Sequence, residues 1–338
     1  PHLLEYVAAL IVGVSCGWLI LHATFAKGSA DRSSMVRFWG FRGPLGAWVA
    51  VWGSLAMLLS APFDDWWHNA YGLDVQIISP PHILLLTGML GIVAGAMLMT
   101  LAEQNRAGDR DSSGFAGMFA LAAAILLLIL VTATFEYTAM PNLWRGRLFY
   151  LISAGTFPLL LAAVARAGRL RWPATATAAL FMLGSLLLSW VLQTVPATPK
   201  LAPIENPLTR LVVAPFPILL IVPAALFDLL HRRWGERRDW RLALLFGAGF
   251  VLALLAVSWP TAAFFLSPAA LNPVFLADQW DFSSPPGAYR YEFWDTLSGG
   301  GDSSVWPAAK TLLGAVLLAT ASSRIGLAFG NWMRRVRR

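Results

Sequence analysis

Two histidines and two aspartates lie close together in an otherwise apolar part of the chain. Residues 61–88 read APFDDWWHNAYGLDVQIISPPHILLLTG and include Asp64, Asp65, His68 and His82. Imidazole and carboxylate groups are common ligands of copper, iron and zinc ions. Ionisable residues are also costly near a lipid bilayer, where they usually have a functional or pairing role. The stretch therefore predicts either a metal site or the polar rim of a membrane protein.

The composition indicates an integral membrane protein. Of the 338 residues, 57% are hydrophobic and 13% are charged, whereas soluble domains carry about 25% charged residues. The net charge of +7 is spread over short loops, and a nucleic-acid partner would require it on one soluble surface. The chain has a single cysteine, Cys16, which excludes an intramolecular disulfide and a cluster of thiolate ligands.

Nine apolar segments approach the roughly 20 residues needed to cross a membrane. Their expected ranges are 3–26, 44–62, 80–102, 115–139, 148–166, 173–195, 211–230, 242–266 and 307–329. All but six of the 25 Lys and Arg residues fall on one set of alternate loops, the six being Arg145, Arg147, Lys200, Arg210, Arg290 and Lys310. This bias places the N-terminus outside and the C-terminus inside. We expect an all-α, polytopic transmembrane helix bundle that forms a single domain over 1–338 in a bacterial inner membrane.

Two expected outer loops are longer than the others. Residues 196–210 are rich in proline, and residues 267–306 combine aromatic with acidic side chains. Disordered linkers contain few aromatic residues, so 267–306 is expected to pack on the outer face or on a partner subunit. An aromatic belt at the membrane interface is the simpler interpretation of the same residues.

Helical spacing decides which polar residues of 61–88 can act together. If the second span continues as a helix, Asp64 and His68 are four residues apart and share one face. Asp65 then points about 100° away, so the two carboxylates need not have the same role. Asp65 is therefore a weaker candidate ligand than Asp64.

The third span has a clear start signal. Ser79 can cap the helix and Pro80 suits its first position, which places His82 in the first turn. The positive end of the helix dipole favours a neutral imidazole there, and a metal ion requires that neutral form. Glu136, at the outer end of the fourth span, is a weaker candidate as a further ligand or as a hydrogen-bond partner of a histidine.

A structural explanation without a metal also fits these residues. Trp66, Trp67 and Tyr71 are typical of helix ends at lipid headgroups. The aspartates could accept hydrogen bonds from backbone amides or pair with Arg145 or Arg147. His82 would then be an ordinary polar residue at a helix start.

Residues 63–88 resemble the C subunit of the particulate methane and ammonia monooxygenases. The resemblance consists of Asp64, Trp67-His68, Asp74 and Pro80-Pro81-His82. It implies that Asp64, His68 and His82 bind copper inside the membrane arm. The 13 residues between His68 and His82 are one more than in that family, and its later asparagine and histidine ligands have no counterpart here.

These observations lead to alternative functions of different classes. The first is a metal-containing, monooxygenase-like oxidoreductase subunit with copper, or else iron or zinc, which oxidises a small apolar molecule with electrons from a partner. The second is a non-catalytic accessory subunit of a membrane electron-transfer or photosynthetic complex. Both imply the lipid bilayer and other membrane or periplasmic subunits as partners. A transporter is less favoured because the polar residues cluster at the ends of the spans instead of at mid-depth.

Overall fold

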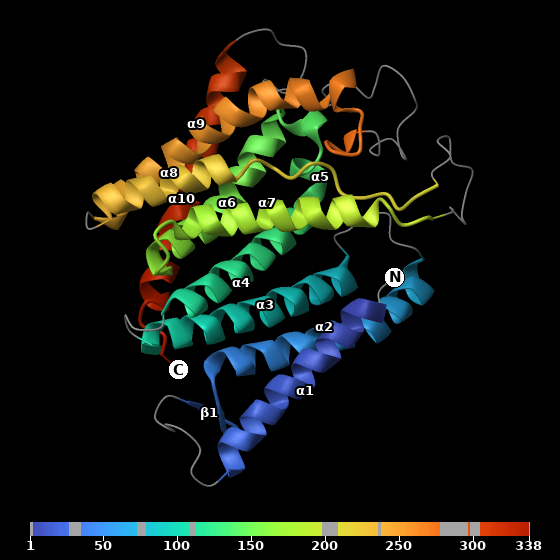
Figure 1. The fold of residues 1–338 in the computed structure, drawn as a ribbon, viewed down its shortest axis with the longest axis vertical. Helices are drawn as coiled ribbons and strands as arrows, with labels where there is room; N and C mark the ends of the chain where they lie inside the picture. The colour runs from blue at the N-terminus through green and yellow to red at the C-terminus, as the bar shows by residue number, and fades with distance from the viewer. Residues whose placement is uncertain are drawn as a thin grey trace. The chain divides into compact units, whose positions relative to one another are not determined.

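Long helices make up most of the computed structural model (Figure 1). It describes residues 3–26, 35–72, 79–107, 112–197, 209–235, 238–277, 297 and 305–337. Within these residues, eight helices are long and apolar enough to cross a membrane. Many of their leucine, isoleucine and tryptophan side chains are exposed, as contact with lipid allows. The chain is therefore an all-α integral membrane protein, as its sequence predicts.

The chain divides into two compact units. Unit 1 comprises Pro1–Ile129 and Trp332–Arg338, and unit 2 comprises Leu130–Asn331. The elements of unit 1 are α1 (Leu3–Phe25), β1 (Val36–Phe38), β2 (Phe41–Gly43), α2 (Leu45–Tyr71), α3 (Pro80–Ala107) and most of α4 (Ser112–Ala133). The two strands form an antiparallel hairpin. The expectation of one transmembrane domain over 1–338 stays a prediction.

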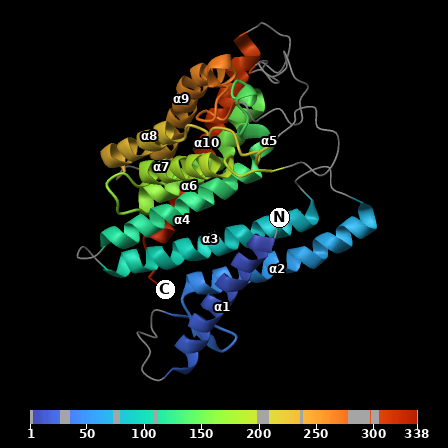
Figure 2. The same ribbon diagram turned by 45° about the vertical axis from the view of Figure 1, so that its right-hand side comes forward.

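The antiparallel helices α2 and α3 of unit 1 lie against each other backbone to backbone (Figures 1 and 2). Glycines on both helices make this approach possible: a Cβ added to Gly53 would lie 2.5 Å from the Ile92 nitrogen, and one added to Gly88 would lie 2.6 Å from the Met57 nitrogen. Small residues allow such close packing of membrane helices. The contacts fix the register of α2 on α3.

Unit 2 contains the end of α4 and most of α10, together with a set of shorter and longer helices. These are α5 (Phe135–Thr138), η2 (Pro141–Leu143), α6 (Arg147–Ala167), α7 (Pro173–Leu192), α8 (Ile221–Trp234), α9 (Asp239–Phe265), η3 (Pro268–Ala270) and α10 (Val305–Met333). Of the expected outer loop 267–306, residues 278–296 and 298–304 lie outside the described residues. Its first part contacts the end of α7, where the Trp190 Nε1–H and the Gln193 amide donate to the carbonyls of Val274 and Pro273.

The seventh expected span, 211–230, is not a continuous helix. Residues 211–219 have no regular secondary structure, and α8 begins only at Ile221. Pro215 and Pro217 explain the difference, because proline has no N–H to donate and disfavours a helical conformation of the residue before it. The apolar composition predicted a span over 211–230 but could not predict its irregular first half.

This irregular segment and α8 together return the chain along the whole length of α7 (Figure 1). At one end, the Leu211 N–H donates to the carbonyl of Val195, close to the end of α7. At the other end, the Asp228 carboxylate of α8 accepts from the N–H groups of Ala174 and Thr175, in the first turn of α7. The nine crossings assumed by the topology stay a prediction, since eight helices of the described residues are long and apolar enough to cross a membrane.

The Asp228 carboxylate of α8 links this helix to the start of α7. The residue is buried, with 1% of its surface exposed, and it also accepts a hydrogen bond from the Thr175 hydroxyl at 2.7 Å. It caps the N-terminus of α7 from a neighbouring helix. Arg232, one turn further along α8, stacks over the ring of Trp172, which immediately precedes α7.

The packing of α2 on α3 leads to a first prediction. Gly53→Ala should lower the free energy of unfolding by about 1–3 kcal/mol, because the added methyl meets backbone atoms that cannot move aside. Gly17→Ala on α1 is the matched control, since nothing lies within 4 Å of its added Cβ, and it should be neutral or slightly stabilising. Thermal unfolding of both variants in detergent tests this; equal midpoints would contradict the close packing.

Candidate functional site

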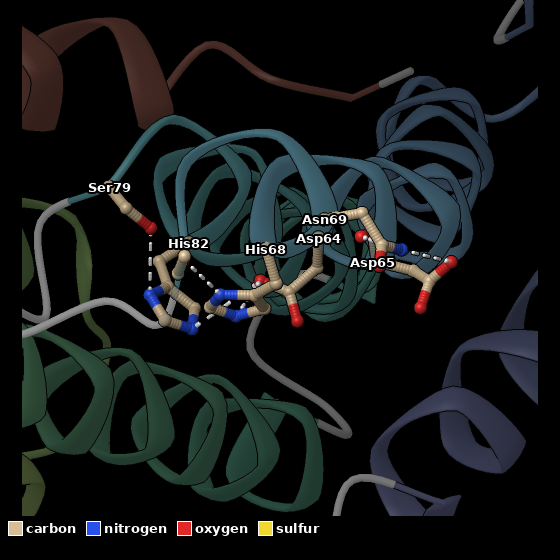
Figure 3. Close-up of polar contacts among 7 residues, drawn as sticks. Asp64, Asp65, His68, Asn69, Ser79 and His82 are labelled. Atoms are coloured by element: carbon tan, nitrogen blue, oxygen red, sulfur yellow. Dashed lines mark hydrogen bonds and ion pairs between the residues drawn. The ribbon is translucent and has the colours of Figure 1, made fainter.

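The end of α2 and the start of α3 bring Asp64, His68 and His82 together (Figure 3). The His68 Nε2 lies 3.4 Å from Asp64 Oδ1, and the His82 Nε2 lies 3.9 Å from the same oxygen. The helical register explains this meeting: Asp64 is seven residues beyond Met57 and His82 is six residues before Gly88, the two positions that touch across the glycine contact. The group belongs entirely to unit 1.

The oxygen at the centre of this group is buried although the side chains around it are not. About a third of the Asp64 side chain is exposed, yet its Oδ1 atom is inaccessible and has no hydrogen-bond partner. A buried carboxylate oxygen without a partner costs on the order of 1–3 kcal/mol or more. Such an atom requires a cation or a well-directed donor close to it.

The ring of His68 is oriented by the residue that ends α2. Its Nδ1 lies 3.0 Å from the carbonyl oxygen of Gly72, and the Gly72 N–H donates in turn to the carbonyl of His68. Because a carbonyl can only accept, the His68 Nδ1 carries the proton. In the neutral ring the Nε2 then carries no proton, and its lone pair faces the Asp64 carboxylate. Gly72 adopts a φ of 85°, which glycine accommodates without strain.

The ring of His82 is held in a similar way by Ser79. The Ser79 hydroxyl lies 2.9 Å from the His82 Nδ1, and the Ser79 carbonyl accepts the N–H of Ile83 as the first hydrogen bond of the helix. Ser79 therefore stands at the expected cap position, but its hydroxyl contacts an imidazole. In both histidines an oxygen engages Nδ1 and the Nε2 faces Asp64, an arrangement typical of metal-binding histidines.

The helix dipoles favour this distribution of charge. His68 lies in the last turn of α2, where the negative end of the dipole favours a cation. The Asp64 carboxylate approaches His82 in the first turn of α3, where the positive end favours an anion. Both effects support an anionic Asp64 with a cation beside it.

The weaker candidates Asp65 and Glu136 are not part of this group of three. Asp65 points away along α2, where its carboxylate and carbonyl both contact the Asn69 amide (Figure 3). Glu136 is an exposed residue of α5 in unit 2. Asp74, which forms part of the monooxygenase resemblance, lies outside the described residues.

Aromatic rings line the C-terminal end of α2 next to the group. Phe63 stacks on Trp66 at 5.9 Å between centroids, and Trp67 packs on Tyr71 at 4.4 Å. Trp66 and Tyr71 are exposed, at 54% and 66%. The interfacial anchor stays a prediction for these rings, and they occupy the same helix end as the polar group without excluding it.

The distances fit a small metal ion in part. Metal–nitrogen and metal–oxygen bonds of about 2.1 Å put the donor atoms of a tetrahedral site about 3.4 Å apart. The Asp64–His68 separation has this length, whereas the Asp64–His82 separation is about half an ångström longer. As the side chains lie, no three His, Cys, Asp or Glu residues within the described part of the chain form a metal-binding cluster.

Comparison with known proteins adds no relative to these observations. No protein-family model, curated protein or solved structure matches the chain. The candidate site is therefore defined by its own geometry.

Sequence reasoning missed the Gly72 carbonyl and the contact from Ser79 to the His82 ring. The signal for the first was a glycine immediately after a helix that ends in polar residues, a common C-terminal pattern. The contact is made by a backbone carbonyl, which every residue has, so the residue types do not indicate it. Only the folded helix end shows that this carbonyl lies against the side chain four residues earlier.

The His68–Gly72 contact leads to a second prediction. In its neutral form, His68 should carry its proton on Nδ1, which ¹⁵N NMR of histidine-labelled protein in detergent can measure. The spectrum of His68→Gln identifies the signal among the five histidines. A neutral His68 with its proton on Nε2 would contradict the contact.

Proposed function

We propose that the chain is a membrane metalloprotein in which Asp64, His68 and His82 bind one metal ion at the junction of α2 and α3. One observation carries the proposal: the buried Asp64 Oδ1, which accepts no hydrogen bond, faces the Nε2 atoms of two histidines. A metal ion between these three atoms would bind the oxygen and both nitrogens. It requires the neutral form of each histidine and the anionic form of the carboxylate.

The residues of the site have distinct roles in this proposal. His68 and His82 supply nitrogen ligands, and the Gly72 carbonyl and the Ser79 hydroxyl hold their rings in place. Asp64 supplies the oxygen ligand and one negative charge. Three protein ligands leave coordination positions open, which a site that binds oxygen or a substrate requires. To bind the same ion, the His82 Nε2 would have to move about half an ångström closer to the Asp64 Oδ1, which a side-chain rotation allows.

Copper is the metal we favour, with iron or zinc as the alternatives, because imidazole nitrogens suit all three. The resemblance of residues 63–88 to the monooxygenase C subunit supports copper. With copper or iron bound, such a site would supply oxygen activation for the oxidation of a small apolar molecule. We further propose a bacterial inner membrane and additional membrane or periplasmic subunits that deliver electrons.

A non-catalytic accessory subunit is the second candidate. It is favoured by the observation that the three side chains, as they lie, do not form a metal-binding cluster within the described residues. In that case a proton on the His68 Nε2 would compensate Asp64, and the group would stabilise the junction of α2 and α3 inside a larger assembly. The two candidates differ in metal content, so one measurement separates them.

The third prediction concerns that metal content. The full chain, purified in detergent without a histidine tag or chelators, should contain close to one copper, iron or zinc ion per molecule by elemental mass spectrometry. Asp64→Asn, His68→Ala and His82→Ala should each reduce the occupancy at least tenfold, because each removes a ligand.

Asp65→Asn is the matched control for this experiment. It makes the same chemical change one residue away, at a side chain that contacts only Asn69 among the contacts described above, and it should keep the metal. If the parent protein neither contains a metal nor takes one up when titrated with Cu(I), Cu(II), Fe(II) or Zn(II), the accessory role is supported instead. Equal occupancy in all five proteins would place the metal elsewhere.

A further inference from the structure

One end of unit 2 combines arginine and tryptophan side chains in a way that the metal site does not explain. At this end α6 and α8 finish and α7 and α9 begin. Contacts between the helices hold it together: the Arg166 guanidinium of α6 pairs with the Asp239 carboxylate of α9 at 2.9 Å, and Asn331 of α10 donates to the other oxygen of Asp239. We call it the arginine end of unit 2.

Positive charge dominates the surface of the arginine end. Its exposed basic residues are Arg169, Arg171, Arg232, Arg233, Arg238 and Arg241. Among the described residues here, the acidic side chains Asp228 and Asp239 are already engaged, the first as the cap of α7 and the second with Arg166 and Asn331. The surface therefore carries a strong net positive potential.

Three of the guanidinium groups at this end lie over tryptophan rings. Arg232 lies 4.9 Å from the centre of the Trp172 ring, Arg233 lies 5.5 Å from that of Trp234, and Arg324 lies 5.4 Å from that of Trp240. Stacking restricts a long side chain and leaves the N–H edge of the guanidinium available for hydrogen bonds. A planar edge of this kind suits two oxygens of a phosphate group.

The opposite end of unit 2, where α6 begins and α9 finishes, differs from the arginine end in its Arg–Trp contacts. A single Arg–Trp contact is described there, Arg145 over Trp259 at 5.0 Å. The Arg145 guanidinium already donates two hydrogen bonds to the Trp259 carbonyl, so its edge is engaged within the protein. The contrast between the two ends indicates that the arginine end recognises something outside the chain.

We propose that the arginine end of unit 2 binds the headgroups of anionic phospholipids. Tryptophan rings prefer the headgroup region of a bilayer, and arginine side chains extend from the apolar region to the phosphates. Trp240 is 64% exposed and begins a helix apolar enough to span the membrane, so its ring lies where headgroups are. An acidic protein could satisfy the charges but would not explain tryptophan rings at the ends of lipid-facing helices.

The topology predicted from the Lys and Arg residues places this end in the cytoplasmic leaflet. Anionic lipids give that leaflet a negative surface potential, and each basic residue near it contributes on the order of 1 kcal/mol of attraction. The bound headgroup would span the ends of α7, α8 and α9. The proposal is independent of the metal site, which belongs to unit 1.

The fourth prediction tests this binding with the full chain in nanodiscs. The midpoint of thermal unfolding should be higher in discs of phosphatidylcholine with 30% phosphatidylglycerol, a chosen test composition, than in phosphatidylcholine alone. Native mass spectrometry should show phosphatidylglycerol retained in preference to phosphatidylcholine. Arg232→Gln/Arg233→Gln should lower the affinity for phosphatidylglycerol on the order of tenfold or more, because two charges near the phosphates are lost.

Two variants control for charge and for folding. Arg147→Gln/Lys310→Gln removes two exposed charges from the opposite end of unit 2 and should keep the preference for phosphatidylglycerol. Arg232→Lys/Arg233→Lys keeps the charge but loses the planar edge, and it should retain part of the preference. Unfolding in pure phosphatidylcholine reports whether each variant is folded, and lipid retention at low temperature remains measurable for a weakened one.

Three outcomes would overturn the proposal. One is an equal loss of preference in the glutamine variants of both ends, which would mean a general charge effect. Another is an unchanged preference in Arg232→Gln/Arg233→Gln. The third is an equal stabilisation by inorganic phosphate in phosphatidylcholine discs, which would identify a soluble anion as the ligand in place of the lipid.

Discussion

The close approach of α2 and α3 is the constraint on which the candidate site depends. Glycines at Gly53 and Gly88 let the two backbones touch, and an antiparallel pair in contact at these positions has only one register. That register carries Asp64 to His82, at the open ends of the helices. A side chain in place of either glycine would separate the helices and move the carboxylate away from the imidazole. In lipid, where burial of apolar surface does not drive helix association, such packing is the main source of this order.

Unit 2 contains an apolar segment, 209–220, that precedes α8 without forming a helix. Backbone N–H and C=O groups in a membrane need partners within the protein, so irregular segments occur there only where neighbouring helices cover them. The segment 209–220 lies along α7 and is partly covered by its neighbours: Val213, Ile218 and Leu220 are buried, and Phe216 packs on Phe265 of α9. Asp228 then fixes the far end by capping α7. The cap and the prolines are thus parts of one arrangement, in which a helix start is stabilised by the chain that returns beside it.

The sequence predicted the features that depend on local spacing and composition. Eight of the nine expected apolar segments became long helices. Asp64 and His68 share a face because they are four residues apart, and Asp65 points away for the same reason. It could not predict features that depend on contacts between distant segments. The cap formed by Asp228 can be predicted only once the position of α7 is known. Two prolines in 211–230 can either interrupt the helix or kink it, and the packing of neighbouring helices decides which. The meeting of Asp64 with His82 was a reasonable hypothesis, but it needed a register that no single segment contains.

The chemistry of the site follows from the hydrogen bonds that its histidines already make. A histidine whose Nδ1 donates to a carbonyl can present only a lone pair or a second proton at Nε2. Facing a carboxylate at 3.4 Å, the lone pair alone is repelled, so His68 either gains a proton or shares a metal ion with Asp64. His82 decides between these states, because one proton can compensate one imidazole and the carboxylate, whereas a metal ion uses both imidazoles at once. The second histidine, aimed at the same oxygen from another helix, is the reason why we propose a metal ion instead of a single ion pair.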